Sequence, residues 1–349
     1  MNFIQDTLIN WYADNRRDLP WRHHPTPYQV WLSEVILQQT RVNQGWDYYL
    51  RFIEKWPTVN DLANASEEEV LKMWQGLGYY SRARNLHQCA KQIVEQYGGQ
   101  FPADFEQLKR LKGVGNYTAA AIASIAFNLP HAVVDGNVYR VLSRLFDIDT
   151  PININEGQTV FAKIADELLN REQPSLHNQA MMEFGALHCT PKNPNCLHCP
   201  LQAQCLAFER QTVMLRPVKL VKLKVTTRYF NYLVIKIEDK LYLRKRSGND
   251  IWKNLYDFPC IESEKPMTVE KIINSEEFVQ LIENKHFTLV KSSQTFTHKL
   301  THRTILAQFI EIKLEEELSQ IQTKDLFLTP ERDLENYPIP RLIDLYLTT

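Results

Sequence analysis

The sequence predicts a multidomain chain, with an all-α part followed by an α+β part. Its 349 residues exceed one ordinary domain and suit two, because domains cluster at about 100–150 residues. Helical periodicity runs through the first two-thirds, and strand-like alternation is nearly absent before residue 225. Hydrophobic residues make up 44% and charged residues 23%, a balance that allows globular domains with buried cores. We expect the boundary near residues 210–228.

Three segments of the first part carry helix signals. Apolar side chains recur at the i, i+3, i+4 and i+7 positions of an amphipathic helix in Tyr28, Trp31, Leu32 and Val35. Ser66–Glu69 is a capping box ahead of an apolar run. Asp104 with Gln107 marks another helix start, ahead of Leu111.

The residues after 225 differ in character. Tyr229–Ile237 and Lys240–Lys245 are rich in aromatic and branched residues and predict a β-hairpin. Phe287–Val290 and Arg303–Ile312 are further strand candidates, and Val269–Ile282 is a predicted helix. The mixture predicts an α+β domain.

No segment predicts export or membrane insertion. The first twenty residues lack a basic region followed by an apolar run, which a signal peptide would show. No stretch approaches the roughly 20 apolar residues that span a bilayer. We therefore expect a cytoplasmic protein.

The segment between Arg210 and Arg228 is basic. It contains Arg216, Lys219, Lys222 and Lys224 and no acidic residue. Such a stripe can follow phosphates, although a solvated linker has the same composition. The net charge of −1 for the whole chain favours neither interpretation.

Residues 104–127 read as two helices joined by a glycine-containing turn. Gly113 and Gly115 can adopt positive φ, which permits a tight reversal and a close approach to a partner. The free amides that open the second helix, up to Thr118, suit an anionic phosphate. Glycine also occurs in helix turns for packing alone, so the motif by itself does not decide.

Two acids lie in apolar surroundings. Glu34 is inside a mostly apolar helix, where it is either exposed or held in a low-dielectric pocket that raises its pKa. Asp135 follows an apolar run and precedes a predicted helix at Val138–Phe146, where an N-cap is the common role. Position alone favours the ordinary role for each. Together, however, they match the acid and the carboxylate that cleave glycosidic bonds.

Four of the six cysteines are crowded together. Spacers of six, two and five residues separate Cys189, Cys196, Cys199 and Cys205. In a cytoplasmic protein this crowding indicates metal binding rather than disulfides. Four thiolates hold zinc or a [4Fe–4S] cluster, and the spacing does not choose between them. The nearby His188 and His198 leave a Cys3His zinc site open.

The chain resembles the helix-hairpin-helix DNA glycosylases related to endonuclease III. The resemblance lies in three features that follow one another in the same order: the helical hairpin, the Val-Val-Asp-Gly-Asn loop and the cysteine motif. Within these glycosylases the chain is similar to MutY-type adenine DNA glycosylases. The supporting segments are Leu19–Arg22, Trp31–Thr40, Gly76–Asn85 and Asn178–Met182. The resemblance is close over residues 5–210 and looser over 225–349.

The resemblance implies roles for the acids. Glu34 protonates N7 of adenine, and Asp135 stabilises the oxocarbenium ion or forms a transient adduct, while Tyr117 and Asn137 orient these groups and water. Bifunctional relatives carry a lysine nucleophile where this chain has Tyr117, so the resemblance implies a monofunctional enzyme. The rivals are a bifunctional lyase and a non-catalytic DNA-binding protein.

The resemblance also implies a pocket for an extruded adenine, because the bond is out of reach within the duplex. Trp21, Arg22 and Gln179 line that pocket. Gln39 and Tyr79 insert beside the lesion. The substrate is double-stranded DNA with adenine opposite 8-oxoguanine or guanine, bound by a monomer. The cysteines hold a structural [4Fe–4S] cluster.

The C-terminal part resembles the MutY C-terminal domains that are related to NUDIX hydrolases, through Gly248–Pro259. The Arg-Glu-x-x-Glu-Glu metal-binding motif does not follow this segment. We therefore do not expect the domain to hydrolyse nucleotides. The family reads the opposite base with a Phe-Ser-His loop, and this chain has Phe296, Thr297 and His298 there. The predicted domains are a glycosylase domain with the cluster loop, a basic linker and an 8-oxoguanine-recognition domain, at 1–208, 209–228 and 229–349.

Overall fold

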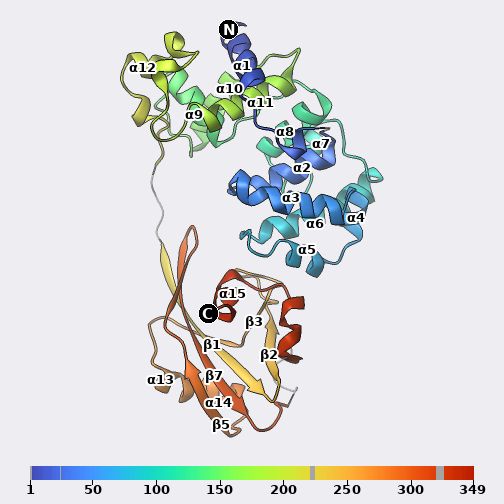
Figure 1. Ribbon diagram of the computed structural model, residues 1–349, viewed down its shortest axis with the longest axis vertical. Helices are drawn as coiled ribbons and strands as arrows, with labels where there is room; N and C mark the ends of the chain where they lie inside the picture. Colours follow the sequence, from blue (N-terminus) through green and yellow to red (C-terminus); the bar gives the residue numbers. More distant parts are fainter. Residues whose placement is uncertain (1, 24, 221–224, 320–325) are drawn as a thin grey trace. The chain divides into compact units, whose positions relative to one another are not determined.

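The computed structural model describes residues 2–23, 25–220, 225–319 and 326–349. The described residues form two compact units (Figure 1). One contains the residues up to Asn64 and from Asn85 to Leu220, and the other contains Ala65–Arg84 and the described residues from Val225 onward. Bonds such as that from the Tyr80 hydroxyl to the Ile339 carbonyl (3.2 Å) join 65–84 to the second unit. The predicted domain limits stay a prediction.

The described residues before 220 are helical, as predicted, and contain no strand. The α-helices are α1 (Asn2–Asn15), α2 (Pro27–Leu37), α3 (Val42–Lys55), α4 (Val59–Asn64), α5 (Glu67–Met73), α6 (Ser81–Tyr97), α7 (Phe105–Lys109), α8 (Asn116–Phe127), α9 (Gly136–Leu145), α10 (Asn155–Leu168), α11 (Pro174–Leu187) and α12 (Leu206–Glu209). Short 3-10 helices are η1 (Pro20–Arg22), η2 (Cys196–His198), η3 (Gln202–Gln204) and η4 (Val213–Leu215). None of the described helices is long and apolar enough to cross a membrane.

The helices begin where side chains satisfy their first amides. The predicted capping box is confirmed, because the Ser66 hydroxyl accepts from the Glu69 amide (3.1 Å) and the Glu69 carboxylate accepts from the Ser66 amide (3.0 Å). Asp104 accepts from the Gln107 amide (2.8 Å), as its position predicted. Thr26 caps α2 in the same way. Local sequence therefore sets these boundaries.

Two helix pairs position the candidate site. Helix α2 packs against α8, whose face is lined by small buried alanines. Helix α9 packs against α11 in a core that includes Leu8, Val141, Phe161 and Phe184. Gly185 lets α11 approach the start of α9, since a Cβ at that position would lie 2.7 Å from Cβ of Asn137.

The second unit contains a mixed eight-stranded sheet whose main path runs β3-β2-β1-β7-β5. Its elements are β1 (Thr226–Ile237), β2 (Lys240–Lys245), β3 (Tyr256–Asp257), β4 (Cys260–Ser263), α13 (Val269–Ile273), α14 (Glu276–Leu281), β5 (Phe287–Ser292), β6 (Phe296–Lys299), β7 (Arg303–Leu314), β8 (Leu326–Pro330), η5 (Glu331–Asn336) and α15 (Arg341–Leu347). Strands β1 and β7 run parallel at its centre (Figure 1). The predicted hairpin is confirmed by the antiparallel β1–β2 pair.

Two details of the second unit differ from the sequence-based expectation. The helix predicted over Val269–Ile282 is two helices, α13 and α14, because the Ser275 hydroxyl accepts from the Phe278 amide (3.3 Å) and starts a new helix there. The Phe296–His298 segment, expected in a loop, lies on strand β6, which pairs with β7.

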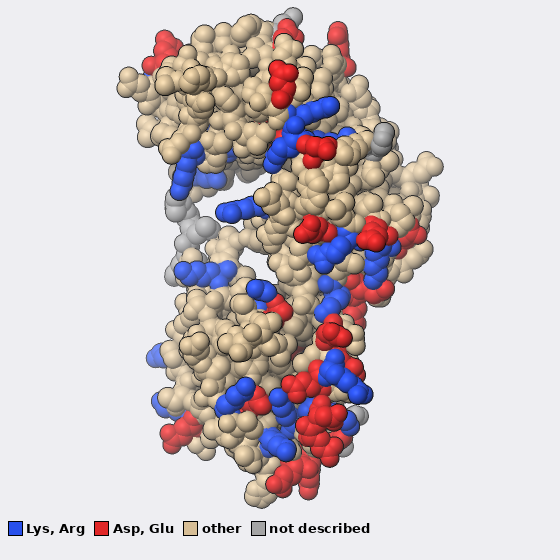
Figure 2. Space-filling view, in the orientation of Figure 1, with Lys and Arg blue, Asp and Glu red and all other residues tan. Residues whose placement is uncertain are grey.

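The arginines of the basic segment are ion-paired. Arg210 and Arg216 both contact Asp147, at 3.3 and 3.0 Å. Arg228 pairs with Asp250 (2.7 Å). Lys222 and Lys224 lie outside the described residues. On the face shown in Figure 2, acidic and basic side chains lie beside one another over the second unit. The described part of the segment therefore offers less free positive charge than its composition indicates.

Replacing Gly185 with alanine tests the contact between α11 and α9. The new Cβ would meet Asn137, so we expect the free energy of unfolding to fall by about 1–3 kcal/mol, the usual cost of overpacking. Gly248→Ala is the matched control, because no atom lies within 4 Å of the added carbon there. Urea unfolding of both variants measures the difference, and equal stabilities would contradict the close packing.

Candidate functional site

Glu34 lies on α2 and is half-buried beside α8. The Tyr117 hydroxyl, from α8, donates a hydrogen bond to its carboxylate. The pKa of Glu34 is raised to about 7, chiefly by burial and also by the charge of Asp135, while the Tyr117 hydrogen bond and Arg22 oppose the rise. A carboxyl group with this pKa is protonated in an appreciable fraction of molecules at neutral pH. It can therefore act as a general acid.

Asp135 caps helix α9, as its position predicted. It accepts hydrogen bonds from the backbone amides of Asn137 (2.9 Å) and Val138 (2.7 Å) and from the Asn137 side chain (2.8 Å). Burial raises the pKa of Asp135, while these bonds and Arg140 oppose the rise. The capping role does not remove Asp135 from the site, because it fixes the carboxylate in place.

The two acids are neighbours in space. The charge of Asp135 helps to raise the pKa of Glu34 and that of Tyr117. The charge of Arg22 has the opposite effect and lowers the pKa of Glu34. The structure therefore brings η1, α2, α8 and the start of α9 to one place. A cation, two carboxyl groups and a phenol converge there.

Arg22 is held by a buried acid that the sequence reasoning missed. Glu183, which is 1% exposed, accepts from Arg22 (2.8 Å) and from the side chain and backbone of Arg17 (2.8 and 3.0 Å). Burial alone would raise the pKa of Glu183, but the hydrogen bonds from the two arginines prevail and lower it to about 2. Glu183 directly follows the Asn178–Met182 segment, and nothing in the sequence marks it as a partner of Arg22.

The other predicted pocket residues lie in two settings. Gln179 accepts from the Tyr12 hydroxyl (3.3 Å), and the guanidinium of Arg22 lies 5.6 Å from the Tyr12 ring centroid. Arg22 and Gln179 are thus joined through Tyr12. Trp21 is buried edge-on against Trp46 and Tyr49, at centroid distances of 5.9 and 5.2 Å.

Gln39 and Tyr79, the predicted insertion residues, share an unusual backbone. Both are exposed and have left-handed φ values of 57° and 49°. Residues other than glycine seldom adopt this conformation, and such strain is concentrated at functional turns. The Tyr79 hydroxyl also lies 2.8 Å from that of Thr301.

The hairpin between α7 and α8 presents free amides. Gly113 has a φ of 75°, and an added Cβ would lie 2.8 Å from Cβ of Asn85. Gly115 is the N-cap of α8 with a φ of −94° and no side-chain cap. The Thr118 side chain is buried and accepts from Gln38 (3.3 Å), which leaves only its amide to meet a phosphate.

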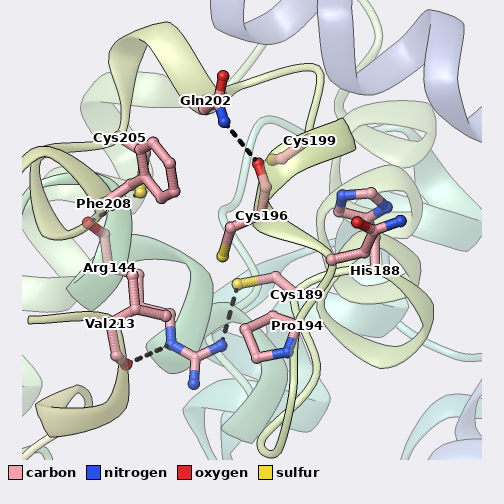
Figure 3. A pocket seen from close by; sticks show the side chains of 11 residues that line it. Arg144, His188, Cys189, Pro194, Cys196, Cys199, Gln202, Cys205, Phe208 and Val213 are labelled. Atoms are coloured by element: carbon pink, nitrogen blue, oxygen red, sulfur yellow. Dashed lines mark hydrogen bonds between the residues drawn. The ribbon is translucent and has the colours of Figure 1, made fainter. Parts of the chain in front are cut away.

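Four thiols line one pocket (Figure 3), contributed by Cys189, Cys196, Cys199 and Cys205. Arg144 donates to the sulfur of Cys189 (3.4 Å) and to the backbone carbonyl of Thr190 (2.8 Å). His188 also lines the pocket, whereas His198 contacts the Asn195 side chain (3.0 Å). Among the described residues, no three metal-binding side chains are close enough to hold a single ion. Four thiols with an adjacent guanidinium fit an anionic cluster.

Arg140 connects the cysteine pocket to the acids and was also missed. Its guanidinium donates to the Asn137 side chain (2.8 Å) and to the carbonyl of Cys189 (2.7 Å). Asn137 in turn bonds Asp135. An interior arginine of an amphipathic helix carries no sequence signal for this role.

The predicted base-reading residues alternate across strand β6. Phe296 packs on Phe309 at 5.4 Å, and His298 lies 5.7 Å from Trp252. Thr297 points the other way and is exposed. Its hydroxyl is thus the most exposed functional group of this triplet.

Comparisons with known proteins find relatives of both parts of the chain. Residues 32–163 match the HhH-GPD superfamily base excision DNA repair proteins, and 231–349 match the NUDIX domain. The chain is 34% identical to an adenine DNA glycosylase of Buchnera aphidicola subsp. Schizaphis graminum, covering 85% of this chain and 84% of that one. A thermostable thymine-DNA glycosylase (TM-score 0.56, 29% identity) and a non-covalent endonuclease III–DNA complex (0.52, 26%) each align with 60% of this chain and 96% of their own. The predicted fold classes are confirmed.

The raised pKa of Glu34 predicts a pH-dependent stability. The folded state binds the proton more tightly than the unfolded state, so its stabilising effect is present below pH 4.5 and is lost as the pH rises through about 7. Glu34→Gln removes this dependence. We expect the variant to gain stability relative to the parent between pH 4.5 and pH 8, by at most about 3 kcal/mol. Urea unfolding at both pH values measures the gain, and parallel pH profiles would contradict the burial of the carboxyl group.

Proposed function

Because the chain belongs to the adenine DNA glycosylases of the HhH-GPD superfamily, we propose that it removes adenine from duplex DNA where adenine faces 8-oxoguanine or guanine. The reaction hydrolyses the N-glycosidic bond and leaves an abasic site. The observation that carries the proposal is Glu34, with a pKa raised to about 7, beside Asp135. Glycosidic cleavage requires one such acid and one such carboxylate.

In the proposed mechanism, Glu34 gives its proton to N7 of adenine. The protonated base leaves as the bond between its N9 and C1′ of the sugar breaks, and positive charge develops on the sugar. Asp135, fixed by its hydrogen bonds to Asn137 and Val138, stabilises that charge or bonds transiently to C1′. Water then adds its oxygen to C1′. The proton that the water releases returns to the site.

The adenine must leave the helix before Glu34 can reach it. Arg22 and Gln179, joined through Tyr12, support a pocket for the flipped base, and Trp21 forms its packed wall. Gln39 and Tyr79 enter the space that the base vacates. Their exposed, left-handed turns favour this use.

Free amides at the start of α8 favour phosphate binding, with Gly113 and Gly115 allowing close approach. The exposed Thr297 hydroxyl is the group proposed to read 8-oxoguanine. With bacterial chromosomal DNA as substrate, we expect a cytoplasmic monomer.

The proposed enzyme is monofunctional. Strand cleavage by a lyase begins with an amine that forms a Schiff base at C1′. Tyr117 offers a phenol instead, and its hydroxyl is engaged by Glu34. A stable adduct after borohydride treatment would favour the lyase alternative.

The four cysteines are proposed to bind a [4Fe–4S] cluster. The lining of one pocket by four thiols supports this, as does the donor bond from Arg144 to Cys189. Four thiolates leave no open coordination position for water. When bound, the cluster would therefore have a structural role and would link the four cysteine side chains to one another. Arg140 and Asn137 extend from the pocket to Asp135.

Metal analysis of the purified chain tests the cluster. We expect about four iron and four sulfide per chain. Cys199→Ser lowers this content because it removes one ligand, whereas Cys89→Ala, a buried cysteine outside the pocket, keeps it. Zinc in place of iron would contradict the assignment.

Single-turnover cleavage of duplexes with adenine opposite 8-oxoguanine, guanine, cytosine and thymine tests the activity. We expect the first two to react, with strand breaks only after alkali. The rate falls about tenfold per pH unit above pH 7, because the protonated form of Glu34 is then depleted. Glu34→Gln lowers the rate at least about a hundredfold and leaves DNA binding intact.

Glu167→Gln is the matched control for this variant, since Glu167 is an exposed carboxylate on α10 that pairs with Lys163 (3.8 Å) and lies outside the proposed site residues. Its rate should equal that of the parent. A Glu34→Gln variant that cleaves as fast as the parent refutes the role of the acid.

A further inference from the structure

Asp250 lies in the loop between β2 and β3 and accepts hydrogen bonds from three arginines. Asp250 accepts from both terminal nitrogens of Arg228 (2.9 and 2.7 Å), from Arg303 (3.0 Å) and from Arg246 (3.3 Å). These arginines lie near the start of β1, at the start of β7 and just after β2. One side chain therefore ties the loop to three segments of the sheet.

Trp252, in the same loop, is held in a conformation that a bulky residue seldom adopts. Its φ is 60° and its side chain is 8% exposed. Its ring lies 5.7 Å from that of His298 and packs edge-on against Phe230 at 6.1 Å. Such a backbone persists only where the surroundings over-determine it. The Asp250 contacts contribute to that constraint, together with the bonds from the Leu255 amide to the Trp252 carbonyl (3.0 Å) and from Arg246 to the Ile251 carbonyl (3.1 Å).

The loop contacts both arms of the β6–β7 hairpin. Trp252 supports His298 on β6, and Asp250 holds Arg303 at the start of β7. The hairpin closes through the Leu300 amide and the Arg303 carbonyl (2.7 Å). Thr297 directly precedes His298 on β6, on the side away from the turn, and is exposed. Its hydroxyl position therefore depends on the loop.

We propose that Asp250 and Trp252 are positioning residues that set the preference for the base opposite adenine, through the placement of Thr297. The inference rests on the proposed function. Guanine and 8-oxoguanine differ only at C8 and N7, so they are told apart by a few hydrogen bonds. Such contacts require placement within about 0.5 Å. Loosening the hairpin removes the discrimination, while the acids on the other unit continue to act on adenine.

The ratio of single-turnover rates on A:8-oxoguanine and A:guanine duplexes tests the proposal in the full chain. Trp252→Asn removes the ring and keeps a residue that tolerates left-handed φ. Asp250→Asn is nearly isosteric and removes the charge. We expect each variant to lower the ratio at least tenfold, with the rate opposite guanine within twofold of the parent. Trp252→Phe restores most of the ratio.

Glu331→Gln is the matched control. Glu331 pairs with Lys236 (3.2 Å), near the opposite end of β1 from Arg228. This variant should keep the parent ratio, which separates positioning from a general loss of ion pairs. Thermal unfolding of each variant accompanies the rates.

Three outcomes overturn the inference. Variants that retain the parent's preference refute the positioning role alone. Equal slowing on both duplexes, or tighter binding to undamaged DNA by Asp250→Asn, shows that the loop serves folding or that the released arginines bind phosphate. A parent without preference refutes the proposed 8-oxoguanine specificity, and with it the inference.

Discussion

The enclosure of Glu34 beside Asp135 is the constraint on which the site depends. Two carboxylates this close repel, and neither is fully hydrated. Burial and the charge of Asp135 together raise the pKa of Glu34, while the hydrogen bond from the Tyr117 hydroxyl opposes the rise. Asp135 keeps its own place because backbone amides at a helix start hold it. Environment thus gives two chemically similar groups different hydrogen-bond partners.

The rest of the helical unit holds this pair in position. Glu183 forms ion pairs with Arg17 and Arg22. Arg22, the cation near Glu34, is therefore held in place by Glu183 and does not pair with Glu34. Arg140 joins Asn137, beside Asp135, to the backbone of Cys189. A chain of hydrogen bonds therefore connects the cysteine pocket to Asp135. In the second unit, Asp250 bonds Arg303 at the start of β7, and β7 pairs with β6, the strand that carries Thr297.

Much of the fold was predictable because its signals are local. The Ser66–Glu69 capping box and the β1–β2 hairpin depend on neighbouring residues, and both occur as predicted. The prediction of one continuous helix over Val269–Ile282 was wrong. The spacing of apolar residues does not show that Ser275 caps a second helix there. Strand β6 was missed because its pairing with β7 is a tertiary event and its four residues are too few to show alternation.

The sequence by itself determined the chemical inventory: two acids in apolar segments, a tyrosine after the hairpin glycines, and four crowded cysteines. Residue type and spacing are properties of the chain, so these could be read directly. Tertiary structure alone decided the pKa of Glu34 and the partners Glu183, Arg140 and Asp250. A pKa depends on which segments exclude water from a group and which charges they bring to it. Packing between segments distant in sequence creates that environment.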